Sequence, residues 1–149
     1  MIKIQSQQFD PEAELRAFRE TNAQCGGLAS FSGYVRDDGG DVEVLTLQHY
    51  PGLCEREIGN IVEAAKNRFD IADCLVVHRF GAMLPGEPIV LVAACASHRK
   101  PALEAVDFLM DFLKTSAPFW KQETRAAQKH WIEPTQNDYA STRSWSEKE

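Results

Sequence analysis

Two lysines are the side chains of this sequence best suited to acid–base chemistry. Lys114 lies at the end of a predicted helix, and Lys121 follows Pro118 in the segment Phe119-Trp120-Lys121. Aromatic neighbours that desolvate the Lys121 ammonium lower its pKa toward the range useful for acid–base catalysis. Lys114 also has a structural explanation, because a cation is favoured near a helix C-terminus and Asp111 lies three residues earlier. A catalytic role and an ordinary surface role are both open for each lysine.

The basic triplet His98-Arg99-Lys100 lies where a predicted strand ends and a predicted helix begins. Free backbone N–H groups at a helix start, with arginine and lysine beside them, form a natural site for a phosphate or a carboxylate. A solvated junction has the same sequence pattern, so both interpretations stay open. Arg36 is a further cation, but two aspartates follow it directly, and alone it indicates nothing.

The order of apolar and turn-forming segments predicts an α+β fold, with helices against a mostly antiparallel sheet. Asp10 and Pro11 are typical of a helix start, as N-cap and first helical residue. The helix after Arg99 tolerates Pro101 in its first turn. Strands are expected over residues 2–9, 28–35, 42–50, 72–78, 89–96 and 129–133, and helices over residues 10–25, 53–69 and from 99 to the break at Pro118.

The connections between these elements give further expectations. Residues 28–35 and 42–50 are expected to pair as an antiparallel hairpin, because the turn-forming segment 36–41 joins them. Residues 81–88 are expected to form a turn, and the piece just after Pro118 to be irregular. The polar tail, residues 134–149, is expected to be loosely held.

Length and composition restrict the class of protein. The chain has 149 residues, of which 44% are hydrophobic and 26% charged, as expected for one globular domain over residues 1–149. The net charge of −6 argues against a general nucleic-acid binder. The first residues lack the apolar core of a signal peptide, and the longest apolar run, residues 89–96, is too short to span a membrane. We therefore expect a soluble, cytoplasmic protein.

The cysteines and histidines show no pattern of a metal site. No C-x-x-C pair occurs, and the four histidines have no ligand spacing against the cysteines, so we expect buried, reduced thiols and no bound metal. Glycine-rich phosphate loops, G-x-S-x-G and H-E-x-x-H are absent as well. The cysteines are Cys25, Cys54, Cys74 and Cys95. The residues alone thus support an α+β domain with a cationic pocket for an anionic small molecule.

Six segments between about residue 28 and residue 133 together carry more information than any one of them. They are Phe31-Ser32-Gly33-Tyr34-Val35-Arg36, Leu47-Gln48-His49-Tyr50-Pro51-Gly52, His78-Arg79-Phe80-Gly81 with Pro85-Gly86-Glu87, Ser97-His98-Arg99, the block from Leu113 to Glu123, and Trp131-Ile132-Glu133. In this order they strongly resemble the large, catalytic subunit of molybdopterin synthase.

The resemblance implies a sulfurtransferase that converts cyclic pyranopterin monophosphate (precursor Z) to molybdopterin. Sulfur would arrive as a thiocarboxylate on the C-terminal Gly-Gly tail of a small ubiquitin-like subunit. The large subunit would form a homodimer within a heterotetramer, without a metal or organic cofactor of its own. The implied fold is an α/β hammerhead with an added small antiparallel subdomain.

The resemblance also implies roles for individual residues. Lys114 and Lys121 match the active-site lysines of the family, and we expect Lys114 to be the principal acid–base group with Lys121 assisting. Arg36, His98 and Arg99 match substrate-binding residues, and they suit a phosphate because they offer charge-assisted hydrogen bonds.

One departure and two alternatives accompany this interpretation. Pro134-Thr135 stands where some relatives carry a basic residue that contacts the pterin from the neighbouring protomer. The main alternative is a non-catalytic relative that binds a small partner protein or an anionic ligand. The retention of both Lys114 and Lys121 argues against it, because binding alone does not need the pair. An unrelated lysine-dependent Schiff-base enzyme is the third candidate.

Overall fold

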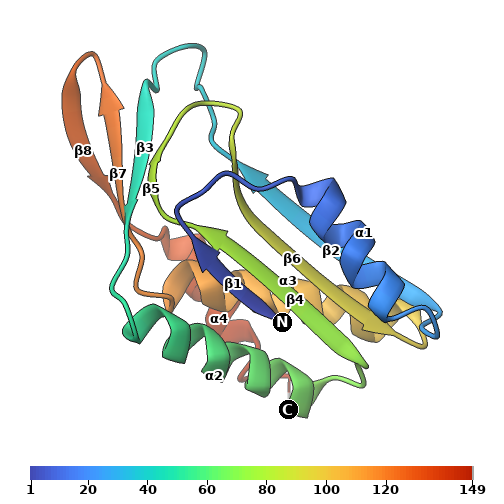
Figure 1. Ribbon diagram of the computed structural model, residues 1–149. Coiled ribbons are helices and arrows are strands. Elements are labelled where there is room, and N and C mark those ends of the chain that lie inside the picture. The colour runs from blue at the N-terminus through green and yellow to red at the C-terminus, as the bar shows by residue number, and fades with distance from the viewer. Residues whose placement is uncertain (149) are drawn as a thin grey trace.

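The computed structural model describes residues 1–148 and has an α+β architecture, as predicted (Figure 1). The strands are β1 (Ile2–Gln5), β2 (Gly27–Tyr34), β3 (Val44–Gln48), β4 (Asp73–Arg79), β5 (Gly81–Met83), β6 (Pro88–Ala96), β7 (Trp120–Arg125) and β8 (Gln128–Ile132). The helices are α1 (Pro11–Thr21), α2 (Leu53–Arg68), α3 (Arg99–Thr115) and α4 (Gln136–Ser144). The predicted start of α1 is confirmed, since Asp10 Oδ1 accepts the backbone N–H of Glu12 at 3.0 Å.

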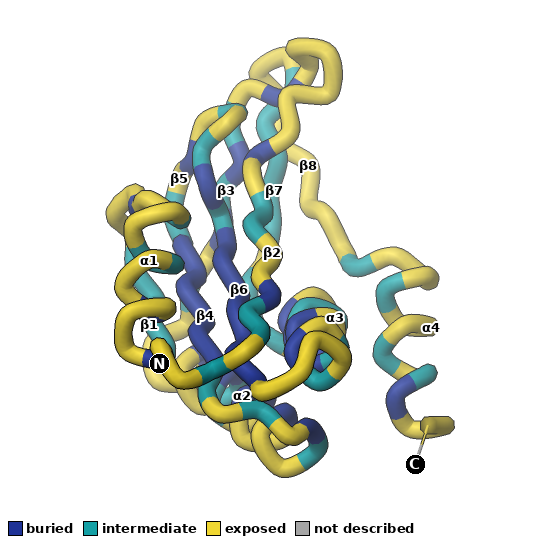
Figure 2. Tube along the Cα trace, turned by 90° about the vertical axis from the view of Figure 1, so that its right-hand side faces the viewer, coloured by how far each residue is buried: buried dark blue, intermediate teal, exposed yellow. Residues whose placement is uncertain are grey.

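The larger sheet has the strand order β1-β4-β6-β2 and is covered on both faces. The pairs β4–β6 and β2–β6 are antiparallel, whereas β1 runs parallel to β4. Val92 and Ala94 of β6 face α2 and α3, while Leu91 and Ala93 face α1. Burial on both faces explains why β6 is a continuous apolar run without polar alternation (Figure 2).

The smaller sheet has the order β5-β3-β7-β8, is antiparallel throughout, and stands at one end of the larger sheet (Figure 1). Its core consists of Leu45 and Leu47 of β3 with Val35, Val42 and Met83. The outermost strand, β8, is exposed along its whole length. This sheet corresponds to the expected small antiparallel subdomain.

The predicted hairpin between residues 28–35 and 42–50 is wrong. Strand β2 pairs with β6 over its whole length, while β3 pairs with β5 and β7 in the other sheet. The turn-like segment between them is therefore a crossover between two sheets. Its start is fixed by Val35, whose N–H donates to the Glu87 carbonyl at 3.0 Å.

Three further expectations need correction. The segment after Pro118 is strand β7 and not irregular, and residues 81–83 of the expected turn form strand β5. The described part of the tail, up to residue 148, is not loosely held, because it contains α4 and a buried tryptophan. Trp145 is only 4% exposed and packs edge-on against Phe69 and Phe108, with ring centroids 5.7 and 5.5 Å apart.

The prediction of buried thiols is confirmed for Cys54, Cys74 and Cys95, whereas the thiol of Cys25 is only partly buried. Within residues 1–148 no three His, Cys, Asp or Glu side chains come together in a way that suits a metal ion. None of the helices in that range is long and apolar enough to cross a membrane.

Candidate active site

Lys114 and Lys121 are brought together by the break between α3 and β7. Lys114 lies in the last turn of α3 with its side chain 50% exposed, and Lys121 is the second residue of β7 and half-buried. The break at Pro118 is fixed to α2, because the Cys54 thiol donates to the Pro118 carbonyl at 3.6 Å. The two ammonium groups lie within electrostatic range, since Lys114 contributes to the pKa of Lys121.

Lys121 has the surroundings of an acid–base group. Burial lowers its pKa below the ordinary lysine value, and the positive charge of Lys114 lowers it further. The carboxylate of Asp138 acts in the opposite direction but does not cancel the effect. Both causes favour the neutral amine, which is the form that accepts a proton.

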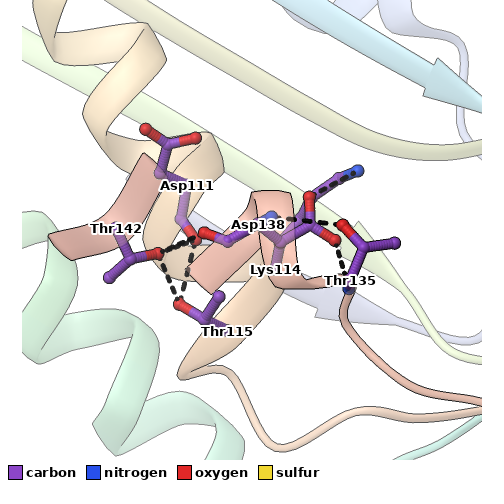
Figure 3. Close-up of polar contacts among 6 residues, drawn as sticks. All are labelled: Asp111, Lys114, Thr115, Thr135, Asp138 and Thr142. Carbon is purple, nitrogen blue, oxygen red and sulfur yellow. Dashed lines mark hydrogen bonds and ion pairs between the residues drawn. The ribbon is translucent and has the colours of Figure 1, made fainter. Parts of the chain in front are cut away.

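Lys114 forms its ion pair with Asp138 and not with Asp111. The Lys114 Nζ lies 3.6 Å from Asp138 Oδ1, on α4 (Figure 3). Asp111 instead accepts the indole N–H of Trp145 at 2.7 Å. The structural explanation from sequence spacing named the wrong partner, because it considered only the helix that carries Lys114.

A stack of aromatic rings supports the start of β7. The Phe119 ring lies on the imidazole of His78, with centroids 4.0 Å apart and planes 7° from parallel. His49 stacks in the same way on Phe80, at 4.2 Å. The pKa of His78 is lowered to about 4, mainly by burial and in addition by the charge of Lys121, while a hydrogen bond to the Arg79 carbonyl acts in the opposite direction. His78 is thus an uncharged packing group beside Lys121 at neutral pH.

His98 and Arg99 lie at the other end of α3, and both are exposed. Lys114 lies fifteen positions after Arg99 on the helix, which corresponds to about 22 Å. The junction before α3 packs tightly against the start of β2: a Cβ on Gly26 would lie 2.6 Å from the Ser97 carbonyl oxygen. The position of His98 and Arg99 is therefore fixed by packing, but it is not next to Lys114 and Lys121 of the same chain.

Arg36 is also separate from the lysine pair. Its side chain is 82% exposed and approaches Asp38 at 3.9 Å. Asp38 in turn pairs with Arg125, whose guanidinium holds the pKa of the Asp38 carboxyl below its usual range. Arg125 lies four residues after Lys121 on β7, or about 13 Å along the strand. Of the five residues singled out from the sequence, Lys114 and Lys121 lie together, His98 and Arg99 lie together at the other end of α3, and Arg36 is separate from both pairs.

Comparison with known proteins identifies the family. Residues 4–116 match the family model described as MoaE protein. The chain belongs to the MoaE protein family. The molybdopterin synthase catalytic subunit of Mesorhizobium japonicum is 44% identical over 146 residues, which cover 97% of this chain and 92% of that protein. The corresponding subunit of Pseudomonas aeruginosa is 42% identical over 148 residues, with 98% and 99% covered.

Solved structures of MoaE proteins have the same fold. The molybdopterin biosynthesis MoaE protein from Burkholderia ambifaria superimposes with a TM-score of 0.84 at 42% identity, covering 98% of this chain and 97% of that one. The resemblance inferred from the six sequence segments and the fold class are thereby confirmed. By its family, the chain is an enzyme subunit of molybdopterin biosynthesis.

Sequence reasoning missed two residues next to the lysine pair. Asp138 was counted among the residues of a loose tail, although Thr135-x-x-Asp138 has the spacing of a helix capping box. That pattern was a usable signal for α4. His78 was recognised only as part of a motif, and nothing in its local sequence indicates that it lies against Phe119.

Proposed function

We propose that this chain is the catalytic subunit of a cytoplasmic molybdopterin synthase, which transfers sulfur to precursor Z. The donor is the thiocarboxylated Gly-Gly tail of a small ubiquitin-like subunit. The observation that carries the proposal is the lysine pair, in which half-buried Lys121 has a lowered pKa beside the charged Lys114. Full-length similarity to relatives that are named catalytic subunits supports a second, smaller subunit.

The lysines supply what thiocarboxylate chemistry requires. Attack on the pterin side chain needs proton transfers at the reacting carbons and stabilisation of oxyanionic intermediates. Lys114 is the principal acid–base group in this proposal, and its exposed ammonium is accessible to an incoming tail. Lys121 assists and orients the substrate, and its lowered pKa favours the neutral amine that accepts a proton.

In this proposal, the other three candidate residues bind the phosphate of precursor Z. Arg36, His98 and Arg99 are exposed, and each can donate charge-assisted hydrogen bonds to a phosphate. Because about 22 Å of α3 separates Arg99 from Lys114, one chain does not offer both to a small substrate. We therefore propose that the chain acts as a homodimer within a heterotetramer, in which His98 and Arg99 of a second copy complete the site.

Reconstitution tests the proposal. The protein is mixed with a thiocarboxylated small subunit and precursor Z, and molybdopterin is measured; the same mixture with an unmodified Gly-Gly carboxylate is the control. The proposal predicts product only with the thiocarboxylate. A stable complex with the small subunit that yields no product would favour the non-catalytic relative. Borohydride trapping of a carbonyl substrate on a lysine would favour a Schiff-base enzyme.

A further inference from the structure

Asp138 uses its two carboxylate oxygens for two different contacts. Oδ2 accepts the backbone N–H of Thr135 at 2.8 Å, and Thr135 Oγ1 accepts the backbone N–H of Asp138 at 3.1 Å. These reciprocal bonds form the capping box that starts α4. Oδ1 is left to face Lys114 Nζ, at 3.6 Å (Figure 3). The cap thus orients the carboxylate toward the lysine.

Helix α4 is itself fastened to α3, so the position of Asp138 is set from two sides. Thr142 Oγ1 lies 2.9 Å from Thr115 Oγ1 and 3.2 Å from the Asp111 carbonyl oxygen of α3 (Figure 3). One turn further, the buried Trp145 donates to the Asp111 side chain. These contacts hold α4 in place even if the cap at Thr135 is weakened.

We propose that Asp138 is a positioning residue for the lysine pair, which fixes the Lys114 ammonium and offsets the repulsion between Lys114 and Lys121. Among residues 1–148, Asp138 is the one carboxylate that forms an ion pair with either lysine. Asp111, the neighbouring carboxylate of α3, is engaged by Trp145. Because Lys114 is half exposed, solvent screens the ion pair and it contributes little to folding.

Removal of the Asp138 charge has a defined electrostatic consequence. Asp138 raises the pKa of Lys121, against burial and the charge of Lys114, so its loss lowers that pKa further. Lys114 loses the carboxylate that holds it, so its ammonium is no longer fixed at one position beside Lys121. Under the proposed function, which this part of the inference rests on, misplacement of the acid–base group lowers kcat roughly tenfold. An anionic substrate binds no more weakly, so KM does not rise.

Two variants separate charge from capping. Asp138→Asn keeps an oxygen that accepts the Thr135 N–H, and so preserves the cap while it removes the charge. Thr135→Ala removes the hydroxyl that accepts the Asp138 N–H and leaves the charge. If Asp138 only capped α4, Thr135→Ala would change the lysine pair and Asp138→Asn would not, whereas a positioning role of the Asp138 charge predicts the reverse.

The test measures the pH dependence of Lys121 acylation by an amine-reactive reagent, followed by peptide mass spectrometry, with no substrate present. We expect the half-labelling pH of Lys121 to fall in Asp138→Asn and to match the wild type in Thr135→Ala. The half-labelling pH of Lys121 in Asp138→Glu should lie close to that of the wild type. Equal profiles in wild type and Asp138→Asn, or equal shifts in both variants, would overturn the inference.

Turnover in the reconstituted system then separates this inference from the proposed function. We expect kcat of Asp138→Asn to fall roughly tenfold at unchanged or lower KM, and Thr135→Ala to turn over like the wild type. A shifted labelling profile together with an inactive wild type would support the role of Asp138 and contradict the proposed function. Unchanged kcat in Asp138→Asn would overturn the catalytic part of the inference.

Discussion

The indole N–H of Trp145 donates a hydrogen bond of 2.7 Å to Asp111 Oδ2, and this contact ties the C-terminal segment to the helix that carries Lys114. The Trp145 ring also lies under the guanidinium of Arg68, 5.5 Å from the ring centroid. Arg68 donates in addition to the Trp145 carbonyl at 2.7 Å. The last helix is therefore anchored to the core through Trp145, and it places Asp138 beside Lys114.

Replacement of Trp145 tests this anchoring. Trp145→Ala removes a buried aromatic side chain, and we expect it to lower the free energy of unfolding by about 3–5 kcal/mol. Trp145→Phe keeps a ring but loses the bond to Asp111, and we expect a smaller loss of about 1–2 kcal/mol. Urea unfolding measures both. A Trp145→Ala variant as stable as the wild type would show that the tail is not packed.

His78 makes stability depend on pH. Its pKa is about 4 in the folded protein against 6.5 for the free side chain, so the unfolded chain binds the proton more tightly. The neutral His78 therefore contributes stability above about pH 6.5, the unfolded pKa. This contribution, about 3 kcal/mol of unfolding free energy in total, is lost as pH falls from about 6.5 to about 4. His78→Phe keeps a ring against Phe119 but does not titrate.

The two proteins are compared by urea unfolding at about pH 7.5 and about pH 4.5. We expect the wild type to lose about 2–3 kcal/mol more than His78→Phe between these conditions. Carboxylates with lowered pKa contribute equally to both proteins and cancel in the comparison. If the stability of both proteins depended on pH in the same way, His78 would not be a buried, neutral imidazole.

The ion pair between Arg79 and Glu87 is partly buried and lies at the turn beside Val35. Arg79 is 8% exposed and donates to Glu87 Oε2 at 2.9 Å and to the Ser6 carbonyl at 3.0 Å. Glu87→Ala leaves the guanidinium without its counter-ion, and we expect a loss of about 2–4 kcal/mol in unfolding free energy.

The matched control for Glu87→Ala is Glu14→Ala, which breaks the more exposed pair between Lys3 and Glu14. We expect that variant to lose less than about 1 kcal/mol, because solvent screens the pair. Thermal or urea unfolding distinguishes the two. Equal losses would show that burial of Arg79 does not strengthen its pair.

Mixed dimers test whether two copies share one site. Lys114→Ala and Arg99→Ala homodimers should both be inactive in the reconstituted system. If Arg99 of one copy serves Lys114 of the other, a mixed dimer has one intact site, and random mixing restores about a quarter of wild-type activity. Absence of any recovery, with subunit exchange confirmed by mass spectrometry, would contradict a shared site.

The sequence predicts a helix or strand well where the pattern of apolar side chains within that segment is enough to define it. The apolar run of β6 and the helical stripe of Ile58, Ile61, Val62 and Ala65 in α2 were found because both patterns are local. The β2–β3 hairpin failed because strand pairing depends on a distant partner: β2 pairs with β6, more than fifty residues later. Local turn chemistry in residues 36–41 fits a crossover as well as a hairpin.

In the candidate site, too, the sequence predicted a local feature and missed a contact between distant segments. Desolvation of Lys121 was expected from its aromatic neighbours, and burial does lower its pKa. The partner of Lys114 was not expected, because Asp138 reaches it from a segment with one buried aromatic residue, Trp145, in an otherwise polar tail. A single tryptophan gives no periodic pattern, so only the assembled fold shows that α4 lies against α3.

Single-turnover reconstitution with Lys114→Ala and Lys121→Ala tests the central claim most directly. The wild type and both variants are each mixed with thiocarboxylated small subunit and precursor Z, and complex formation is measured alongside molybdopterin. We expect all three proteins to bind the small subunit, and both variants to form product at least about a hundredfold more slowly than the wild type. Near-normal product formation by Lys114→Ala within an intact complex would contradict the account.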